Sequence, residues 1–137
     1  MRTRPEIAAV AGAPRLLLRF EGLALLAAAT VGFHLTSLSW WLYGVLFFVP
    51  DVSFAAYGAG PRVGAVVYNA LHSTIGPALL AGTGLLLGDA RLLGVAAIWA
   101  AHIGFDRMLG YGLKYASGFS DTHLGRIGRP DHAQADA

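Results

Sequence analysis

Four long apolar stretches follow one another along this chain, separated by short groups of polar and turn-forming residues. They run over about residues 16–35, 38–57, 63–87 and 92–110. A helix needs about 20 apolar residues to cross a hydrocarbon layer of about 30 Å, and each stretch is close to that length. The pattern therefore predicts an all-α fold, an integral membrane bundle of four helices.

The residues between the stretches predict short connections. Thr36 and Ser37 follow the first stretch, the glycine- and proline-containing residues 58–61 follow the second, and Gly88 and Asp89 follow the third. Such residues break helices and form turns. Because short connections make consecutive helices antiparallel, we expect an up-down bundle that forms one membrane domain over residues 1–137.

Two prolines and the C-terminal residues modify this simple arrangement. Pro50 and Pro77 lie inside the second and third stretches, and we expect Pro50 to kink its helix. Residues 111–137 are rich in Gly, Asp, His and Arg, and this composition predicts a short amphipathic segment followed by a tail.

The composition supports a membrane environment and excludes several other classes. Of the 137 residues, 55% are hydrophobic and only 13% are charged, whereas soluble domains carry about 25% charged residues. The chain contains no cysteine, which excludes disulfides, thiolate metal sites and cysteine nucleophiles. The net charge is only +2, so the lipid bilayer is the expected partner and nucleic acid is not.

The basic residues predict how the helices are oriented. Nine of them lie on the face that both termini share, whereas the opposite face carries only Arg91; the nine are Arg2, Arg4, Arg15, Arg19, Arg62, Arg107, Lys114, Arg126 and Arg129. Cytoplasmic loops carry the excess of Lys and Arg in membrane proteins. We therefore expect a multi-pass protein with both termini, and the segment 111–137, in the cytoplasm.

Five ionisable residues inside the stretches point to a shared site: Glu21, Asp51, His72, His102 and Asp106. Since the helices alternate in direction and rise about 1.5 Å per residue, all five are expected roughly 6 to 14 Å below the cytoplasmic edge. A charged group at this depth costs about 2.5 to 3.5 kcal/mol or more if it faces lipid. We therefore expect these side chains to face one another.

Imidazoles and carboxylates from facing helices are the usual ligands of metal sites in helical bundles. The sequence predicts that His72, His102, Asp106, Asp51 and Glu21 bind a divalent metal, with Zn, Fe and Mn all open. Such a metal would activate water, as in a metal-dependent hydrolase that acts on a membrane-associated substrate.

Further residues near the cytoplasmic end complete the predicted site. Asp51 and Asp106 are candidate catalytic groups, and Arg107 and Lys114 are expected to hold an anionic lipid headgroup or a phosphate-bearing substrate. Four residues are expected to support the site: Tyr68, Asn69, Tyr111 and His123.

Two other functions remain open at this stage. His72 and His102 lie on separate helices at a similar depth, so they would also suit haem b, with the carboxylates handling protons or ions. Alternatively, the polar residues specify packing in a structural or accessory membrane protein without catalysis. Oligomerisation is also open.

Several strings along the chain form a recognisable pattern: WW at 40–41, PD at 50–51, YNALH at 68–72, His102, THLG at 122–125 and, as the most specific part, DRMLGYGLKY at 106–115. In these residues the chain resembles a family of small bacterial integral membrane proteins classed as a domain of unknown function. This resemblance covers about residues 16–125. It implies a four-span protein of the bacterial inner (cytoplasmic) membrane and offers no catalytic residue to transfer.

Overall fold

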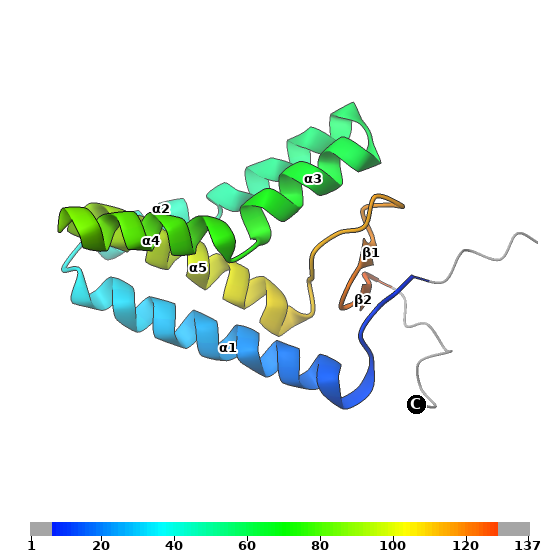
Figure 1. The fold of residues 1–137 in the computed structure, drawn as a ribbon, viewed down its shortest axis with the longest axis horizontal. Coiled ribbons are helices and arrows are strands. Elements are labelled where there is room, and N and C mark those ends of the chain that lie inside the picture. The colour runs from blue at the N-terminus through cyan, green and yellow to red at the C-terminus, as the bar shows by residue number, and fades with distance from the viewer. Residues whose placement is uncertain (1–6, 129–137) are drawn as a thin grey trace, which may run out of the picture.

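The computed structural model describes residues 7–128 and is mostly helical (Figure 1). Its elements, in chain order, are α1 (Gly12–Leu35), α2 (Trp40–Leu46), the 3-10 helix η1 (Val49–Ala59), α3 (Pro61–His72), α4 (Ile75–Leu87), α5 (Ala90–Leu109), β1 (Asp121–Thr122) and β2 (Gly125–Arg126). Arg2, Arg4, Arg129 and the tail 129–137 lie outside the described residues.

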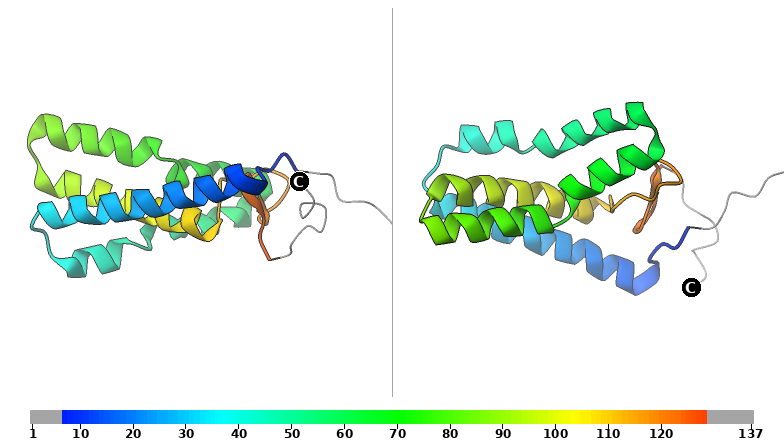
Figure 2. Two further views of the ribbon diagram at one scale, coloured as in Figure 1. Left: turned by 90° about the horizontal axis from the view of Figure 1, so that it is seen from below. Right: turned by 45° about the horizontal axis from the view of Figure 1, so that its top comes forward.

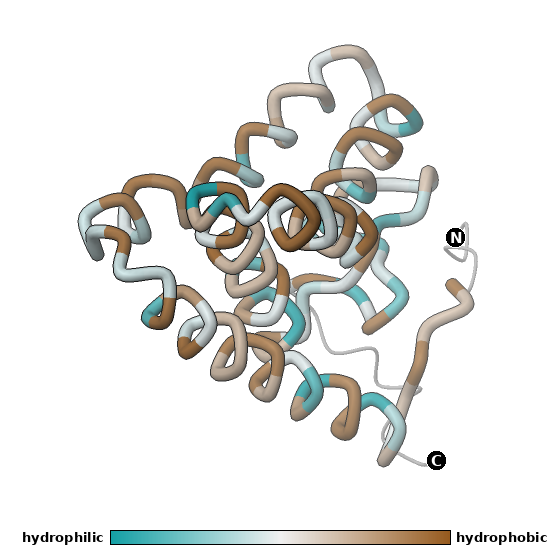
Figure 3. The backbone as a smooth tube through the Cα atoms, turned by 60° about the vertical axis from the view of Figure 1, so that its left-hand side comes forward, coloured by the Kyte–Doolittle hydropathy of each residue, from teal (hydrophilic) through white to brown (hydrophobic). Residues whose placement is uncertain are grey.

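Four helical segments are long and apolar enough to cross a membrane: Gly12–Leu35, Trp40–Ala59, Pro61–Leu87 and Ala90–Leu109. Large apolar side chains cover their outer surfaces; Leu86 is 89% exposed and Trp41 81%. The backbone tube is correspondingly hydrophobic or intermediate along most of the helices (Figure 3). The prediction of an all-α, four-span membrane bundle is confirmed.

The second and third spans are broken, and each break lies one turn before a proline. α2 ends at Leu46, four residues before Pro50, and Ser73, four residues before Pro77, is extended with φ −85° and ψ 152°. A proline ring clashes with the carbonyl of the fourth residue before it, which ends the preceding helix there. The kink expected at Pro50 is therefore a full interruption, the third span is interrupted in the same way, and both breaks lie upstream of the prolines.

Helix α5 is the centre of the bundle. It packs antiparallel to α1 on one side and to α4 on another, while α3 and η1 pair with each other and diverge from it (Figures 1 and 2). Gly22 and Gly104 allow the backbones of α1 and α5 to touch, because a Cβ built on Gly104 would lie 2.6 Å from the Gly22 carbonyl oxygen. This close contact fixes α5 against the longest helix of the bundle.

Residues 111–127, here called the C-terminal segment, fold back over the end of the bundle where α1 begins (Figure 1). β1 and β2 form an antiparallel hairpin that pairs Asp121 with Arg126, and Leu124 is fully buried. This part of the predicted amphipathic segment is therefore an ordered loop and hairpin. The reason is that long-range hydrogen bonds hold it to the helices.

Candidate metal centre

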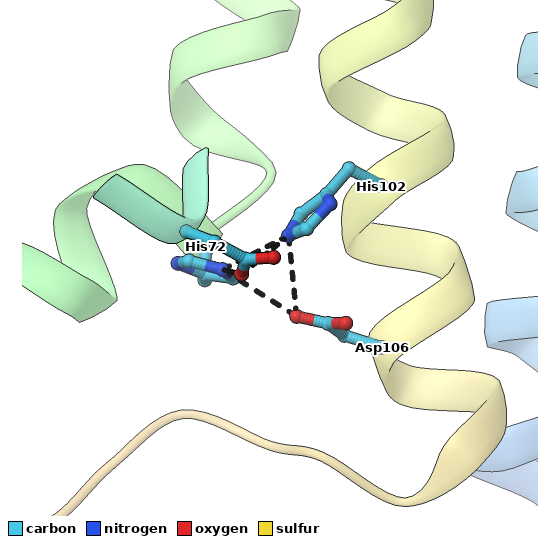
Figure 4. Close-up of side chains that lie close together, drawn as sticks. His72, His102 and Asp106 are labelled. Carbon is cyan, nitrogen blue, oxygen red and sulfur yellow. Dashed lines mark hydrogen bonds and ion pairs between the residues drawn. The ribbon is translucent and has the colours of Figure 1, made fainter. Parts of the chain in front are cut away.

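Four predicted ligands from three helical elements converge in the interior of the molecule. Asp51 comes from η1, His72 from the last residue of α3, and His102 and Asp106 from α5. We call these four residues the cluster. Figure 4 shows His72 facing His102 and Asp106 across the gap between α3 and α5.

Local sequence explains why each side chain reaches this point. The break before Pro50 places Asp51 in the first turn of η1, and the break at Ser73 makes His72 the end of α3. His102 and Asp106 are four residues apart, so they share one face of α5. Irregular backbone at membrane depth is tolerated where protein shields it, and both breaks border the cluster.

The ligand atoms of the cluster are separated by very similar distances. The two Nε2 atoms of His72 and His102 are 3.1 Å apart. His72 Nε2 lies 3.6 Å from Asp51 Oδ1 and 3.4 Å from Asp106 Oδ2, and the corresponding distances from His102 Nε2 are 3.3 and 3.4 Å. All four ligand atoms lie within 4.8 Å of one another. They therefore surround a single point.

Tyr68 fixes the orientation of His72. The Nδ1 atom of His72 lies 2.9 Å from the Tyr68 carbonyl oxygen. Because a carbonyl only accepts hydrogen bonds, Nδ1 carries the hydrogen and Nε2 presents its lone pair to the cluster. The Tyr68 ring stacks on the imidazole at 3.8 Å, and its hydroxyl interacts with the Asp106 carboxylate.

His102 is held mainly by packing. Its side chain is 2% exposed, and the edge of its ring meets Phe47 with the ring centroids 5.3 Å apart. The backbone carbonyl of Phe47 faces the imidazole, but Nδ1 forms no hydrogen bond within normal limits among the described residues. This side chain is thus positioned by its surroundings and keeps Nε2 directed at the cluster.

A cavity of about 360 Å³ opens on the carboxylate side of the cluster. Asp51 and Asp106 line it, with side chains 33% and 15% exposed, whereas the two histidines lie behind them. The remaining lining residues are Phe54, Tyr68, Phe105, Leu109, Tyr111, Lys114, Phe119 and Ile127. The carboxylates therefore separate the cavity from the two histidines.

Lys114 lies in the wall of this cavity and is 4% exposed. Its Nζ donates a 2.7 Å hydrogen bond to the Phe119 carbonyl and lies 3.7 Å from the centroid of the Phe119 ring. Burial lowers the pKa of Lys114 to about 8, against the opposing effect of Asp106. The side chain therefore remains mostly protonated at neutral pH.

Three predicted supporting residues line the cavity or hold the segment that carries Lys114. Asn69 donates to the Lys114 carbonyl at 2.8 Å and accepts from the Lys114 N–H at 2.7 Å, so it anchors the C-terminal segment to α3. Tyr111 lines the cavity. His123 accepts a 2.8 Å hydrogen bond at Nδ1 from the Leu113 N–H. Asn69 and His123 thus place Lys114 rather than contact the cluster.

Two predicted site residues lie away from the cluster. Glu21 is exposed on α1 and is not part of the group of ligand atoms. Its neighbour Gly22 is the residue that faces α5, so the carboxylate of Glu21 points elsewhere. Arg107 lies near enough to His123 to influence its charge but does not line the cavity.

Two contributors to the site were not anticipated from the sequence. Trp99 donates a 2.6 Å hydrogen bond from its indole N–H to the Leu71 carbonyl, a group that the break at Ser73 releases from helical pairing. Phe119 supplies the carbonyl that holds Lys114. The contact of Trp99 could have been predicted, because an indole N–H in the middle of the fourth span needs a hydrogen-bond partner there. The position of Phe119 has no such signal.

Acidification is expected to loosen the C-terminal segment. Burial, with a smaller effect of Arg107, lowers the pKa of His123 below its ordinary 6.5. His123 therefore binds a proton more readily in the unfolded state than in the folded state. The stability that the neutral His123 contributes to the fold is fully present above pH 6.5 and is lost as the pH falls through the folded pKa. Protonation of Nδ1 also removes its acceptor. The protection of the Leu113 amide from hydrogen exchange should drop between pH 7 and about pH 5.

The matched control for this effect is His123→Gln, which cannot titrate in that range. Its Leu113 amide should show the same protection at both pH values after correction for intrinsic exchange. An equal loss of protection in the variant would show that another group is responsible.

Comparison with known proteins places the site within a family. The family model described as "Domain of unknown function (DUF4260)" matches residues 15–127. No curated protein and no solved structure matches this chain. The match includes all four cluster residues and nearly all of the described chain, and it confirms the resemblance to a family of unknown function drawn from the sequence motifs.

Proposed function

The chain belongs to the DUF4260 family, and we propose that it is a membrane metalloenzyme, a hydrolase that holds one divalent metal ion in the cluster. Its substrate is associated with the membrane. The observation that carries this proposal is the set of distances between the ligand atoms of Asp51, His72, His102 and Asp106.

Those distances match the dimensions of a tetrahedral zinc site. Zinc binds His nitrogen and carboxylate oxygen at about 2.0 to 2.1 Å, and the edge of such a tetrahedron is about 3.3 to 3.4 Å. Five of the six ligand pairs are 3.1 to 3.6 Å apart. The geometry and the two-nitrogen, two-oxygen ligand set favour zinc over Fe and Mn, which more often bind with higher coordination numbers.

The hydrogen-bonding pattern also favours a cation. The Nε2 lone pair of His72 faces carboxylate oxygens and the second imidazole at hydrogen-bond distance or slightly beyond. Lone pairs that converge in a buried space repel one another unless protons or a metal lie between them. The hydrogen bond from His72 to the Tyr68 carbonyl is the kind of outer contact that orients histidine ligands in metal sites.

The same distances argue against haem b. Two axial histidines bind haem iron from opposite faces of the porphyrin, so the macrocycle must lie between their rings. With the two Nε2 atoms 3.1 Å apart and two carboxylates beside them, this space does not accommodate a porphyrin. A bare ion fits the cluster better.

The side of the cluster that faces the cavity suits hydrolysis. A bound metal would lower the pKa of water to about 7 and polarise the scissile group. Catalytic zinc sites combine three protein ligands with an open position for water. Asp51 is the more exposed carboxylate, so we assign it to the position where water from the cavity would replace it at the metal, and its freed carboxylate would then accept a proton from that water. Asp106 is the less exposed carboxylate, and the two histidines close the buried side.

We assign the protein to the bacterial cytoplasmic membrane, with the C-terminal segment on the cytoplasmic side. Among the described basic residues, Arg15, Arg19, Arg62, Arg107, Lys114 and Arg126 belong to the end of the bundle where both termini emerge, and Arg91 belongs to the other end. The positive-inside rule then supports this orientation.

Elemental analysis and absorption spectroscopy of the detergent-purified protein test the metal assignment. We expect close to one zinc per chain and no absorption in the Soret region. A stoichiometric chromophore of haem, or the lack of any transition metal even after incubation with zinc, would contradict it.

Turnover of chromogenic carboxylic and phosphoric esters in micelles tests the reaction class. At saturating zinc, Asp51→Asn should lose about 10²- to 10⁴-fold in kcat, the usual contribution of a general base. Glu21→Gln removes a carboxyl group that is exposed on α1 and should leave turnover unchanged. Zinc-loaded wild-type protein that hydrolyses none of these esters would contradict the assignment as a hydrolase.

A further inference from the structure

Lys114 is the one cationic side chain among the described residues that line the cavity, and it is placed to recognise a substrate. We infer that the cavity binds the phosphodiester group of a membrane lipid, with Lys114 as the residue that contacts its charge, and that this binding requires the metal. The inference rests on the proposed function and specifies its substrate class.

Lys114 makes no ion pair among residues 7–128. Its ammonium group is held by the Phe119 carbonyl and lies over the rings of Phe119 and Tyr68, 3.7 and 4.7 Å from their centroids. These groups satisfy one donor and provide a favourable aromatic surface, but they do not neutralise the charge. The Asp106 carboxylate raises the pKa of Lys114 without forming an ion pair with it, and a bound metal would neutralise this carboxylate. A buried cation is then left without a counter-ion, and an anionic ligand in the cavity would provide one.

The charges around the cavity specify how many negative charges the ligand carries. Two carboxylates and a divalent ion cancel, so the metal-loaded cavity has the single positive charge of Lys114. Without the metal, Asp51 and Asp106 outnumber Lys114, and the cavity repels anions. A bound metal ion would therefore both supply the chemistry and change the net charge of the cavity from negative to positive.

Among hydrolysable groups, the phosphodiester fits this charge. Carboxylic esters are neutral, and phosphomonoesters carry about 1.5 to 2 negative charges at neutral pH. A phosphodiester carries one negative charge and has two non-bridging oxygens, so it can contact both the metal and Lys114. Its hydrolysis consumes one water, forms one P–O bond, breaks one ester P–O bond and delivers a proton to the leaving alcohol, which leaves a phosphomonoester.

The walls of the cavity favour a lipid as the source of this group. Phe54, Phe105, Leu109 and Ile127 surround the polar floor. The cavity also lies where the fourth span ends at Leu109, which is the level of lipid headgroups in the proposed orientation. An amphiphile would place its phosphate against Lys114 and its apolar part against these side chains.

Binding of three matched probes to the zinc-loaded protein in micelles tests the inference. The probes are dioctanoylphosphatidylglycerol, dioctanoylglycerol with the same chains and no phosphate, and dimethyl phosphate with the same charged group and no chains. We expect the phosphatidylglycerol to bind at least roughly tenfold more tightly than either of the others, since a hydrogen bond to a charged group is worth about that factor or more. Removal of zinc should abolish this preference.

Lys114→Met should weaken phosphatidylglycerol binding roughly tenfold to a hundredfold while zinc content and dioctanoylglycerol binding stay unchanged. Retained zinc shows that the variant is folded at the cluster, and Lys114→Arg should recover part of the binding. Arg62→Met changes the net charge equally at an exposed position at the start of α3, and it should have no effect.

The possible failures are distinguishable. If the wild-type protein binds no zinc, the proposed function fails and the inference fails with it. If zinc binds but phosphatidylglycerol shows no preference over dioctanoylglycerol, or Lys114→Met binds it as wild type does, the inference is overturned and the metal site stands. Equal binding of dimethyl phosphate would overturn the assignment to a lipid.

Discussion

Alanine in place of His72 or His102 is expected to lower the affinity for zinc by more than about a hundredfold, because loss of an outer contact alone costs about ten- to a hundredfold in such sites. The two side chains are 3% and 2% exposed and supply both nitrogen ligands. Neither variant should retain zinc after dialysis against a weak chelator, and elemental analysis measures this directly.

The matched control is His34→Ala, because His34 is exposed near the end of α1 that is remote from the cluster. It should retain zinc as the wild-type protein does, and so should Glu21→Gln, although Glu21 was a ligand candidate on sequence grounds. Zinc retained at wild-type affinity by both His72→Ala and His102→Ala would disprove the metal site.

Gly104→Ala is expected to destabilise the bundle by about 1 to 3 kcal/mol, the usual cost of overpacking a tight contact. The added methyl group would lie 2.6 Å from both the Gly22 carbonyl oxygen and the Leu26 backbone nitrogen. Backbone atoms cannot rotate away, so α1 and α5 must separate. Since Gly104 lies between His102 and Asp106, zinc affinity should fall as well. Thermal unfolding in detergent, monitored by tryptophan fluorescence, measures the loss of stability.

Gly82→Ala introduces the same methyl group into α4, where nothing lies within 4 Å of the added Cβ. Alanine is the better helix former, so stability should be unchanged or rise by up to about 1 kcal/mol. The two variants thus have opposite expected signs. A Gly104→Ala protein as stable as Gly82→Ala would show that the contact between α1 and α5 is looser than described.

The convergence of the cluster followed from the sequence because the cost of burying charge in lipid limits the alternatives. Asp51, His72, His102 and Asp106 were expected at one depth, and polar groups at one depth in a small bundle have few partners except one another. Glu21 was expected at a similar depth but lies on another side of α1. The expected depth of a residue depends on its position along the helix, which the sequence gives. The direction in which its side chain points depends on how the helix is rotated in the bundle, which the sequence does not give.

The positions of the two helix breaks could be predicted only in part from the sequence. Pro50 and Pro77 were visible, but the consequence of each falls on the fourth residue before it, where α2 and α3 end. The result is that His72 terminates a helix instead of lying within one. Without this interruption, His72 and Asp51 would belong to regular spans, and their approach to α5 would depend on side-chain length alone.

The sequence by itself determined the membrane class, the four spans and the position of the polar residues along each span, because each depends on local composition and on the constant rise of a helix. Tertiary structure decided which of those residues meet, that Lys114 enters the cavity while Arg107 does not, and that the C-terminal segment is ordered. These outcomes depend on helix rotation and on contacts between residues far apart in the chain, such as that of Asn69 with Lys114. No local sequence pattern encodes these contacts, because they stabilise the protein only after the helices have packed.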